Sequence, residues 1–167
     1  MISSRVYKIA VTGPKGAGKS AFIQRCRQNL HAFDSLYGIV DIPLYLTASG
    51  HWVNFCEITS EDYHNPSCWQ YAGVDGAIFV YSAENFEEMK QGINWWSENI
   101  HSFPTLMDVE TVVLMTQMDV SNAAAMKSST MAAAVFAGLH FASSKTGDGI
   151  SYAIESLISG IVADIAV

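Results

Sequence analysis

The chain has 167 residues, about the length of one ordinary domain, and 50% of it is hydrophobic while only 15% is charged. This composition excludes disorder and supplies enough apolar side chain for one packed core. The net charge of −7 is divided unevenly: residues 1–33 hold six basic residues and no acid (+6), and residues 34–167 hold three lysines and sixteen acids (−13). A broad surface for nucleic acid or anionic membrane is excluded, because phosphates would repel most of the chain, whereas one local anion site near the N-terminus is compatible with this charge.

Hydrophobic patterning in the first half of the chain predicts strands around one helix. Residues 5–12 form an apolar, β-branched run that ends at Gly13-Pro14, which is typical of a buried strand. Residues 19–30 have helical spacing of apolar side chains. A hairpin is predicted from two further strands, residues 39–47 and 51–59, and the polar stretch 60–67 is predicted to be a loop.

Strands and helices alternate in the second half. Their expected ranges are 75–82 (strand), 83–100 (helix), 111–116 (strand), 122–138 (helix), 139–142 (strand) and 150–162 (helix). This alternation predicts a single α/β domain over residues 1–167. Its sheet should have about six strands, mostly parallel with one antiparallel hairpin strand, and helices on both faces.

Targeting and redox features are sparse. Three cysteines without a CxxC pair predict neither a disulfide framework nor a zinc ribbon. The N-terminal residues do not read as a secretory signal, and the longest nearly apolar run, 131–142, is too short for a membrane span. Glycine is not the second residue and no C-terminal cysteine is present, so no lipid anchor is expected. These features predict a cytoplasmic protein without stable direct membrane attachment.

The most specific motif is Gly13-Pro14-Lys15-Gly16-Ala17-Gly18-Lys19-Ser20, which matches GxxxxGK(S/T) between a predicted strand and a predicted helix. In this context the glycines let backbone N–H groups converge on phosphate oxygens, and the helix N-terminus adds a favourable dipole. The alternative is a glycine-rich turn with an incidental lysine. The motif predicts a three-layer phosphate-loop NTPase fold, with Lys19 on the phosphates and Ser20 on Mg²⁺. The nucleotide-binding residues expected here are Gly13, Lys15, Gly16, Ala17, Gly18, Lys19, Ser20 and Ala21.

Four stretches together, VTGPKGAGKSAFIQR, YAGVDGAIFVYSAENFEEM, TVVLMTQMD and FASSKTGDGI, resemble the Ras superfamily of small GTPases, and most nearly its Rab-like members. The resemblance covers essentially the whole chain. It implies GTP or GDP with Mg²⁺ as cofactors, and a protein partner in trafficking or transport, either an effector or a subunit of a complex.

The resemblance also implies a base-recognition site. The family's NKxD aspartate accepts hydrogen bonds from guanine, and its lysine packs over the base; here Asp119 remains, while Thr116 and Gln117 replace the asparagine and lysine. A carboxylate accepts from two adjacent N–H groups, which adenine cannot match. The alternative for Asp119 is an acid favoured at a helix N-terminus. The family's loop over the base is matched by Ser143, Ser144 and Lys145.

The residues that would catalyse hydrolysis depart from the family. Glu57 occupies the position of the Mg²⁺-binding aspartate, so the expected metal ligands are Ser20 and Glu57. Ser60 replaces a glycine, and Glu61 replaces the glutamine that orients water. A carboxylate at Glu61 cannot donate to the transferring phosphoryl group, and its charge opposes the charge that develops there. Bulk at Lys15 would crowd the attacking water. The first-switch threonine has no counterpart between residues 31 and 41.

Three hypotheses follow for function. The first is an atypical GTPase-like protein that binds guanine nucleotide, hydrolyses it slowly or not at all, and acts as a protein-binding module. The second is an active GTP-hydrolysing switch with unconventional catalytic residues. The third, a small phosphate-loop kinase, is disfavoured because no arginine follows Arg27 to hold a second set of phosphates.

Weaker signals concern a partner surface and a metal. Trp69 and Tyr71 lie where Rab-like proteins often present aromatic side chains to effectors, although ordinary core packing is an equal alternative. Trp95 and Trp96 are neighbours on one predicted helix, so one of them should be partly exposed. Two interpretations are open for Glu61, Asp62, His64 and Cys68: a zinc site or a plain polar loop. The polar loop is favoured. We expect the basic residues that flank the motif to be part of the solvated surface: Arg5, Lys8, Arg25 and Arg27.

Overall fold

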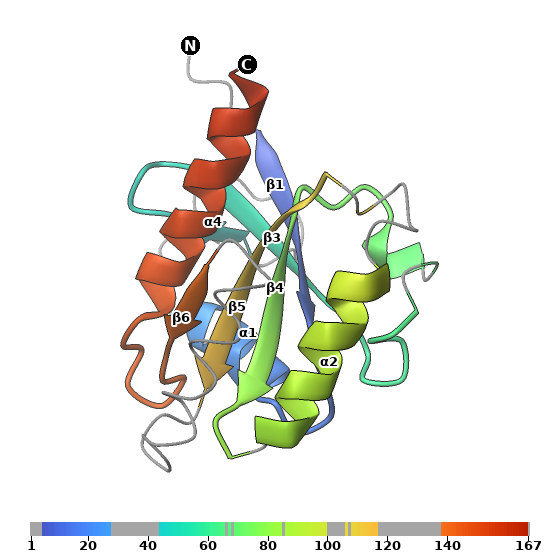
Figure 1. The fold of residues 1–167 in the computed structure, drawn as a ribbon. Helices are drawn as coiled ribbons and strands as arrows, with labels where there is room; N and C mark the ends of the chain where they lie inside the picture. Colours follow the sequence, from blue (N-terminus) through green and yellow to red (C-terminus); the bar gives the residue numbers. More distant parts are fainter. Residues whose placement is uncertain are drawn as a thin grey trace.

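The computed structural model describes residues 5–27, 44–65, 67, 69–84, 86–99, 106, 108–116 and 138–166. Within these ranges strands and helices alternate, as Figure 1 shows. The elements are β1 (Val6–Thr12), α1 (Lys19–Arg27), β2 (Leu44–Leu46), β3 (Trp52–Glu57), the 3₁₀ helix η1 (Trp69–Tyr71), β4 (Gly76–Ser82), α2 (Phe86–Asn99), β5 (Glu110–Thr116), β6 (Leu139–Phe141) and α4 (Ile150–Ile165).

The strands form one six-stranded sheet in the order β2-β3-β1-β4-β5-β6. Every neighbouring pair is parallel except β2 with β3, which is an antiparallel hairpin. The predicted α/β architecture, with a mostly parallel sheet of six strands and one antiparallel pair, is therefore confirmed. Because β1, β3, β4, β5 and β6 run in the same direction, the loops that follow them leave from one edge of the sheet.

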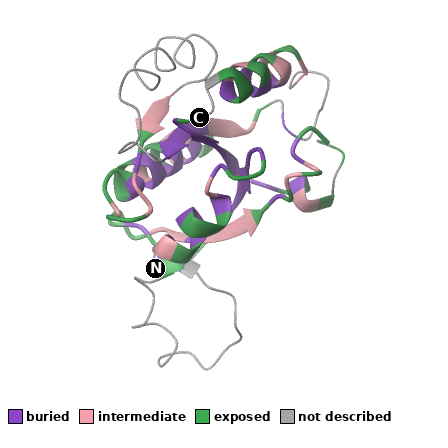
Figure 2. Cartoon of the chain, turned by 90° about the horizontal axis from the view of Figure 1, so that it is seen from below, coloured by how far each residue is buried: buried purple, intermediate pink, exposed green. Residues whose placement is uncertain are grey.

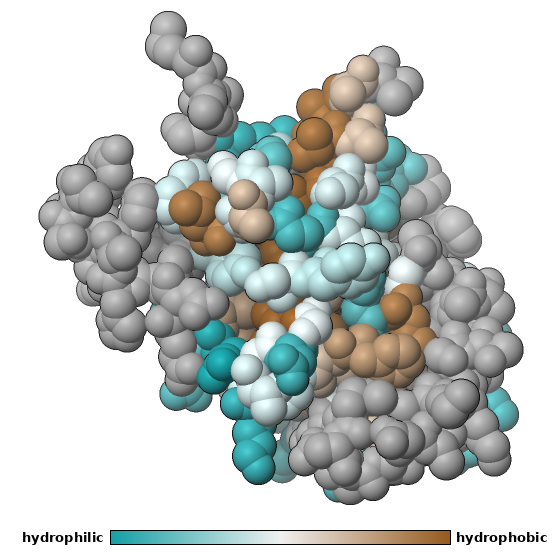
Figure 3. Space-filling view, turned by 90° about the vertical axis from the view of Figure 1, so that its left-hand side faces the viewer, coloured by the Kyte–Doolittle hydropathy of each residue, from teal (hydrophilic) through white to brown (hydrophobic). Residues whose placement is uncertain are grey.

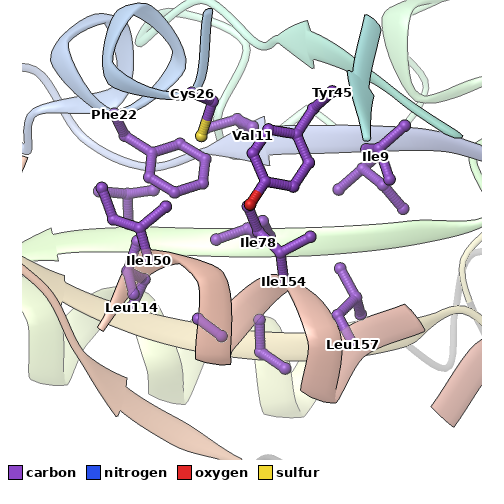
Figure 4. Close-up of a cluster of buried hydrophobic side chains, with 14 of the residues drawn as sticks. Ile9, Val11, Phe22, Cys26, Tyr45, Ile78, Leu114, Ile150, Ile154 and Leu157 are labelled. Atoms are coloured by element: carbon purple, nitrogen blue, oxygen red, sulfur yellow. The ribbon is translucent and has the colours of Figure 1, made fainter. Parts of the chain in front are cut away.

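Helices cover both faces of the sheet, because successive side chains of the central strands point to opposite sides. On one face, Ile9, Ile78 and Leu114 pack with α1 and α4. Figure 4 shows Phe22 of α1 beside Ile150 of α4 in this cluster. The opposite face packs against α2 through Ala10, Ala77, Phe79, Val113, Met115, Met89, Ile93 and Trp96. In Figure 2 the strands between these helices are mostly buried.

The predicted boundaries agree with the described elements to within a few residues. α4 continues to Ile165, beyond the predicted end at residue 162, because no glycine or proline follows to interrupt it. The predicted loop after β3 does contain turns, and η1 behind it was not predicted. The predicted helix 122–138 lies outside the described residues except for its last residue. Residues 28–30 of the first predicted helix and 39–43 of the predicted hairpin also lie outside them.

Three of the four flanking basic residues make specific contacts at the protein surface, which the prediction of solvated surface did not include. Arg5 pairs with Asp75, and the Lys8 ammonium donates to the carbonyl of Ala72 at 2.7 Å. Arg25 donates from its guanidinium to the carbonyl of Thr146 at 2.8 Å. These contacts fasten β1 and α1 to loops far along the chain.

In the part of the chain that the structure describes, no helix is long and apolar enough to cross a membrane.

Candidate phosphate-binding site

The loop between β1 and α1 owes its shape to its glycines. Gly13, Gly16 and Gly18 have φ angles of 151°, 78° and 94°, a region that residues with a Cβ rarely adopt. A Cβ on Gly13 would also come within 2.2 Å of the carbonyl oxygen of Val80 in β4. The loop therefore lies directly against β4, and α1 begins at its end with N–H groups that have no partner within the helix.

Lys19 lies inside this loop. Its ammonium nitrogen Nζ donates to the carbonyl oxygens of Gly13 at 2.6 Å and Pro14 at 2.9 Å, and to the hydroxyl of Ser60 at 3.0 Å. The residue is buried at 6% exposure. Burial lowers the pKa of Lys19, and the nearby carboxylates of Glu57 and Glu88 partly oppose this shift. The carbonyl oxygens of the loop thus lie around the Lys19 ammonium group.

Ser20 and Glu57, the two predicted metal ligands, lie together. The Ser20 hydroxyl donates to Oε1 of Glu57 at 2.6 Å, although the two residues are 37 positions apart. Ser20 opens α1 and Glu57 ends β3, and both are exposed. A hydroxyl and a carboxylate oxygen are hard ligands of the kind that Mg²⁺ binds, and a metal with several retained waters needs few protein ligands. The donor set therefore fits Mg²⁺.

Thr116, at the end of β5, supports the loop from behind. Its hydroxyl donates to the carbonyl of Ala17 at 2.7 Å and lies 3.2 Å from the carbonyl of Tyr81. Thr116 is 2% exposed, and Gly18 packs beside it, since a Cβ there would lie 3.5 Å from the hydroxyl. The sequence presents Thr116 only as a departure from a family pattern, whereas the structure shows that its hydroxyl holds the loop.

The remaining predicted residues are divided by their position. Ser143, Ser144 and Lys145 follow β6 at the same edge of the sheet as the glycine-rich loop. Their segment is closed by the Ser143 hydroxyl, which accepts from the Thr146 N–H at 3.2 Å, and it is joined to α1 through the contact of Arg25. Gln117 and Asp119 lie outside the described residues.

Three predicted residues at the mouth of the loop face solvent. Lys15, within the glycine-rich loop, and Ala21, in the first turn of α1, are both exposed. Glu61 is exposed in the turn after β3, next to Ser60. No local pattern indicated that Ser60 would contact Lys19, because the two residues are 41 positions apart.

The aromatic residues proposed for a partner surface behave differently from one another. Trp69 is 79% exposed, but Tyr71 is 1% exposed. Tyr71 packs edge-on against Trp96, and its hydroxyl lies 2.6 Å from that of Thr12. Of the two alternatives for Tyr71, core packing is therefore the correct one, because this side chain fills the core behind β1. Trp96 is buried and Trp95 is half-buried, as neighbouring positions on one helix require.

No continuous apolar surface joins the exposed hydrophobic side chains on the face drawn in Figure 3, where separate apolar areas are interrupted by polar atoms among the described residues. The exposed large side chains in this part of the chain are Val6, Leu46, Trp69, Phe141, Tyr152 and Ile165.

The acidic and histidine residues after β3 form ordinary loop contacts. Asp62 accepts from the hydroxyl of Thr59 at 3.0 Å, and the His64 ring lies against Trp95 at 4.5 Å between centroids. No cluster of His, Cys, Asp and Glu suited to a metal occurs among the described residues, and Cys68 is not one of them. The contacts of Asp62 and His64 agree with a polar loop, and the zinc alternative, which includes Cys68, stays untested.

A serine, a histidine and a glutamate meet at the hairpin turn, which the sequence did not indicate. The Ser49 hydroxyl donates to Oε2 of Glu155 at 2.6 Å and lies 3.0 Å from Nδ1 of His51. A hydrolytic triad needs the histidine between serine and carboxylate, so that the histidine can take the serine proton. Here the serine proton is directed to the carboxylate, and the contact instead fastens the β2–β3 turn to α4.

No family model matches this chain, and no curated protein matches it either. The site is therefore interpreted from its own geometry.

Proposed function

We propose that this protein is an atypical small-GTPase-like protein with a phosphate-loop NTPase fold, which binds GTP or GDP with Mg²⁺ and hydrolyses GTP weakly or not at all. The observation that carries the proposal is the loop wrapped around Lys19, whose Nζ lies 2.6 Å from the carbonyl oxygen of Gly13 at the N-terminus of α1. Backbone N–H groups at a helix N-terminus and a buried lysine are the groups that bind the phosphates of a nucleotide. The resemblance of four stretches to the Ras superfamily supports the same interpretation.

Ser20 and Glu57 would hold Mg²⁺, Ser20 directly and Glu57 through water. When bound, the metal supplies positive charge next to the phosphates. This charge matters here, because Glu57 and Glu88 both act electrostatically on Lys19 and would repel a bare phosphate. Nucleotide binding should therefore depend strongly on Mg²⁺.

Guanine would be selected by Asp119, next to Gln117, with Ser143, Ser144 and Lys145 over the base. This part of the proposal rests on the family resemblance and on the position of the 143–145 segment, which leaves the sheet at the same edge as the phosphate loop. Adenine lacks the two adjacent donors that a carboxylate recognises in guanine.

Weak hydrolysis follows from the groups near Lys19. The Ser60 hydroxyl accepts a hydrogen bond from Lys19, and the next residue, Glu61, has an exposed carboxylate. The described part of the site therefore offers no amide side chain to orient water. A negative charge at this position opposes the charge that develops on the transferring phosphoryl group. The second candidate, an active switch with unconventional catalytic residues, retains the same binding site.

With poor catalytic groups, the protein would act by binding another protein, such as an effector or a subunit of a transport complex. Exposed Trp69 and half-buried Trp95 are the aromatic side chains that we propose for such contact. Tryptophan frequently dominates the binding energy of protein interfaces.

Calorimetric titration with GTP, GDP and ATP, each with and without Mg²⁺, tests the proposal. We expect GTP and GDP to bind and ATP to bind at least about tenfold more weakly. Lys19→Ala should abolish binding, while Lys90→Ala on α2 should leave it unchanged. Absence of binding by any nucleotide at millimolar concentration refutes the proposal, and equal binding of ATP refutes the guanine selectivity. Multiple-turnover phosphate release that Lys19→Ala abolishes would instead support the active switch.

A further inference from the structure

The ammonium group of Lys19 has no donor to spare. A lysine carries three N–H donors, and Nζ has an acceptor for each: the carbonyl oxygens of Gly13 and Pro14 and the hydroxyl of Ser60. Two of these acceptors belong to the phosphate loop itself. Ser60 is the acceptor that comes from another part of the chain.

The segment around Ser60 is held on both sides. Ile58 is fully buried and its N–H donates to the carbonyl of Val11 at 2.9 Å. Tyr63 is 4% exposed, and its hydroxyl forms a hydrogen bond with that of Tyr81. Between these anchors the N–H of Asp62 closes a turn onto Thr59 at 3.1 Å. The backbone of Ser60 is thereby held at a position from which its hydroxyl reaches Lys19.

A phosphate oxygen that binds Lys19 must replace one of these acceptors, because the ammonium cannot donate a fourth hydrogen bond. Replacement of the Gly13 carbonyl would leave a buried backbone oxygen without this donor, and replacement of the Pro14 carbonyl would leave one with only the N–H of Ala17, at 3.3 Å. Either change costs more than release of a half-buried hydroxyl that can turn to water. The acceptor that is easiest to displace is therefore Ser60.

We propose that the Ser60 hydroxyl is an internal competitor of phosphate: it occupies the donor of Lys19 that a bound nucleotide needs, and so sets a low affinity for nucleotide. The inference rests on the proposed nucleotide binding and adds the residue that limits it. Removal of the hydroxyl leaves this donor to an exchangeable water, which a phosphate displaces more readily.

Titration of Mg-GTP and Mg-GDP into the full chain and its Ser60 variants tests this inference. Ser60→Ala and Ser60→Gly both remove the hydroxyl and should bind about three- to tenfold more tightly, the factor that one hydrogen bond is worth. Ser60→Thr keeps a hydroxyl and should bind like the unmodified protein. Ser67→Ala removes an exposed serine from the same loop region and serves as the matched control.

The double variant Lys19→Ala/Ser60→Ala should not bind nucleotide, like Lys19→Ala alone, because the hydroxyl competes only for the lysine. Binding by the double variant would overturn the competition. Thermal melting of each variant identifies those that fail to fold, and two hydroxyl-deleting variants are included for that reason. Unchanged or weaker binding by both folded variants, with binding by the unmodified protein, overturns this inference alone. Absence of binding by every variant overturns the proposed function as well, whereas binding only by the variants without the hydroxyl supports this inference and overturns nucleotide binding by the unmodified protein.

Discussion

Replacement of Thr116 by valine tests whether its hydroxyl holds the phosphate loop. Valine has nearly the same shape, so the substitution removes the hydroxyl without opening a cavity. The side chain is 2% exposed, and its hydroxyl donates to the carbonyl of Ala17, a residue that is also 2% exposed. The substitution therefore removes one hydrogen bond and leaves a buried carbonyl oxygen without this donor.

The expected loss is about 1–3 kcal/mol of unfolding free energy, because a buried acceptor without a partner costs that much. The second contact of the hydroxyl, 3.2 Å from the carbonyl of Tyr81, adds little, since one proton cannot fully serve two acceptors. For a chain of this length the loss corresponds to a decrease of roughly 3–10 °C in melting temperature.

Urea unfolding followed by tryptophan fluorescence measures the change, because Trp96 is fully buried. Thr111→Val is the matched control: it makes the same substitution on the same strand at a half-buried position, and it should change stability by no more than about 0.5 kcal/mol. Equal stability of the two variants would refute the role of Thr116 in holding the loop.

Three further predictions concern backbone, core and pH. Gly13→Ala should lower the free energy of unfolding in urea by about 3 kcal/mol or more, because its Cβ would lie 2.2 Å from a β4 carbonyl oxygen. Gly16→Ala, with open space around it, should lower it by about 1–2 kcal/mol. Equal losses would contradict the close approach of Gly13 to β4. Trp96→Ala should cost about 3–5 kcal/mol and Trp69→Ala less than about 0.5, as measured by the same unfolding curves; a large loss for Trp69 would contradict its exposed position. Burial lowers the pKa of His140 from 6.5, so the unfolded state takes up its proton first, and stability should fall as pH decreases through about 6.5 and stay level above it. His140→Gln should flatten that part of the curve, and an unchanged slope in unfolding free energy between about pH 5 and 7 would contradict this reasoning.

The glycine-rich loop illustrates what could be predicted from the sequence. An apolar run, glycines at set spacing and an amphipathic stretch are local features, and they predicted the strand, the loop and the helix in order. Periodicity indicates which side chains face a core, so it also predicted the alternation of strands and helices. That alternation predicted the mixed sheet with its antiparallel hairpin. Ser20 and Glu57 were predicted from the resemblance to be ligands of one metal ion. In the structure the Ser20 hydroxyl lies 2.6 Å from Oε1 of Glu57.

Other features could not be read from local patterns. Tyr71 lies next to exposed Trp69, yet it is buried, because its ring fills space behind β1 and against α2. Sequence spacing does not distinguish these two aromatic side chains. Arg5 and Arg25 looked like solvated charges for a similar reason, since their partners lie 70 and 121 residues away.

By itself the sequence determined local elements of this protein: the glycine-rich loop, the lysine at its end, and the strand and helix that flank it. Local conformation and burial periodicity depend on neighbouring residues, so they are legible in the order of amino acids. The tertiary structure decided which distant groups complete the loop, because strand order and register bring Thr116 to Ala17 across 99 residues and Ser60 to Lys19 across 41. Those contacts depend on how the sheet assembles, which no local pattern encodes.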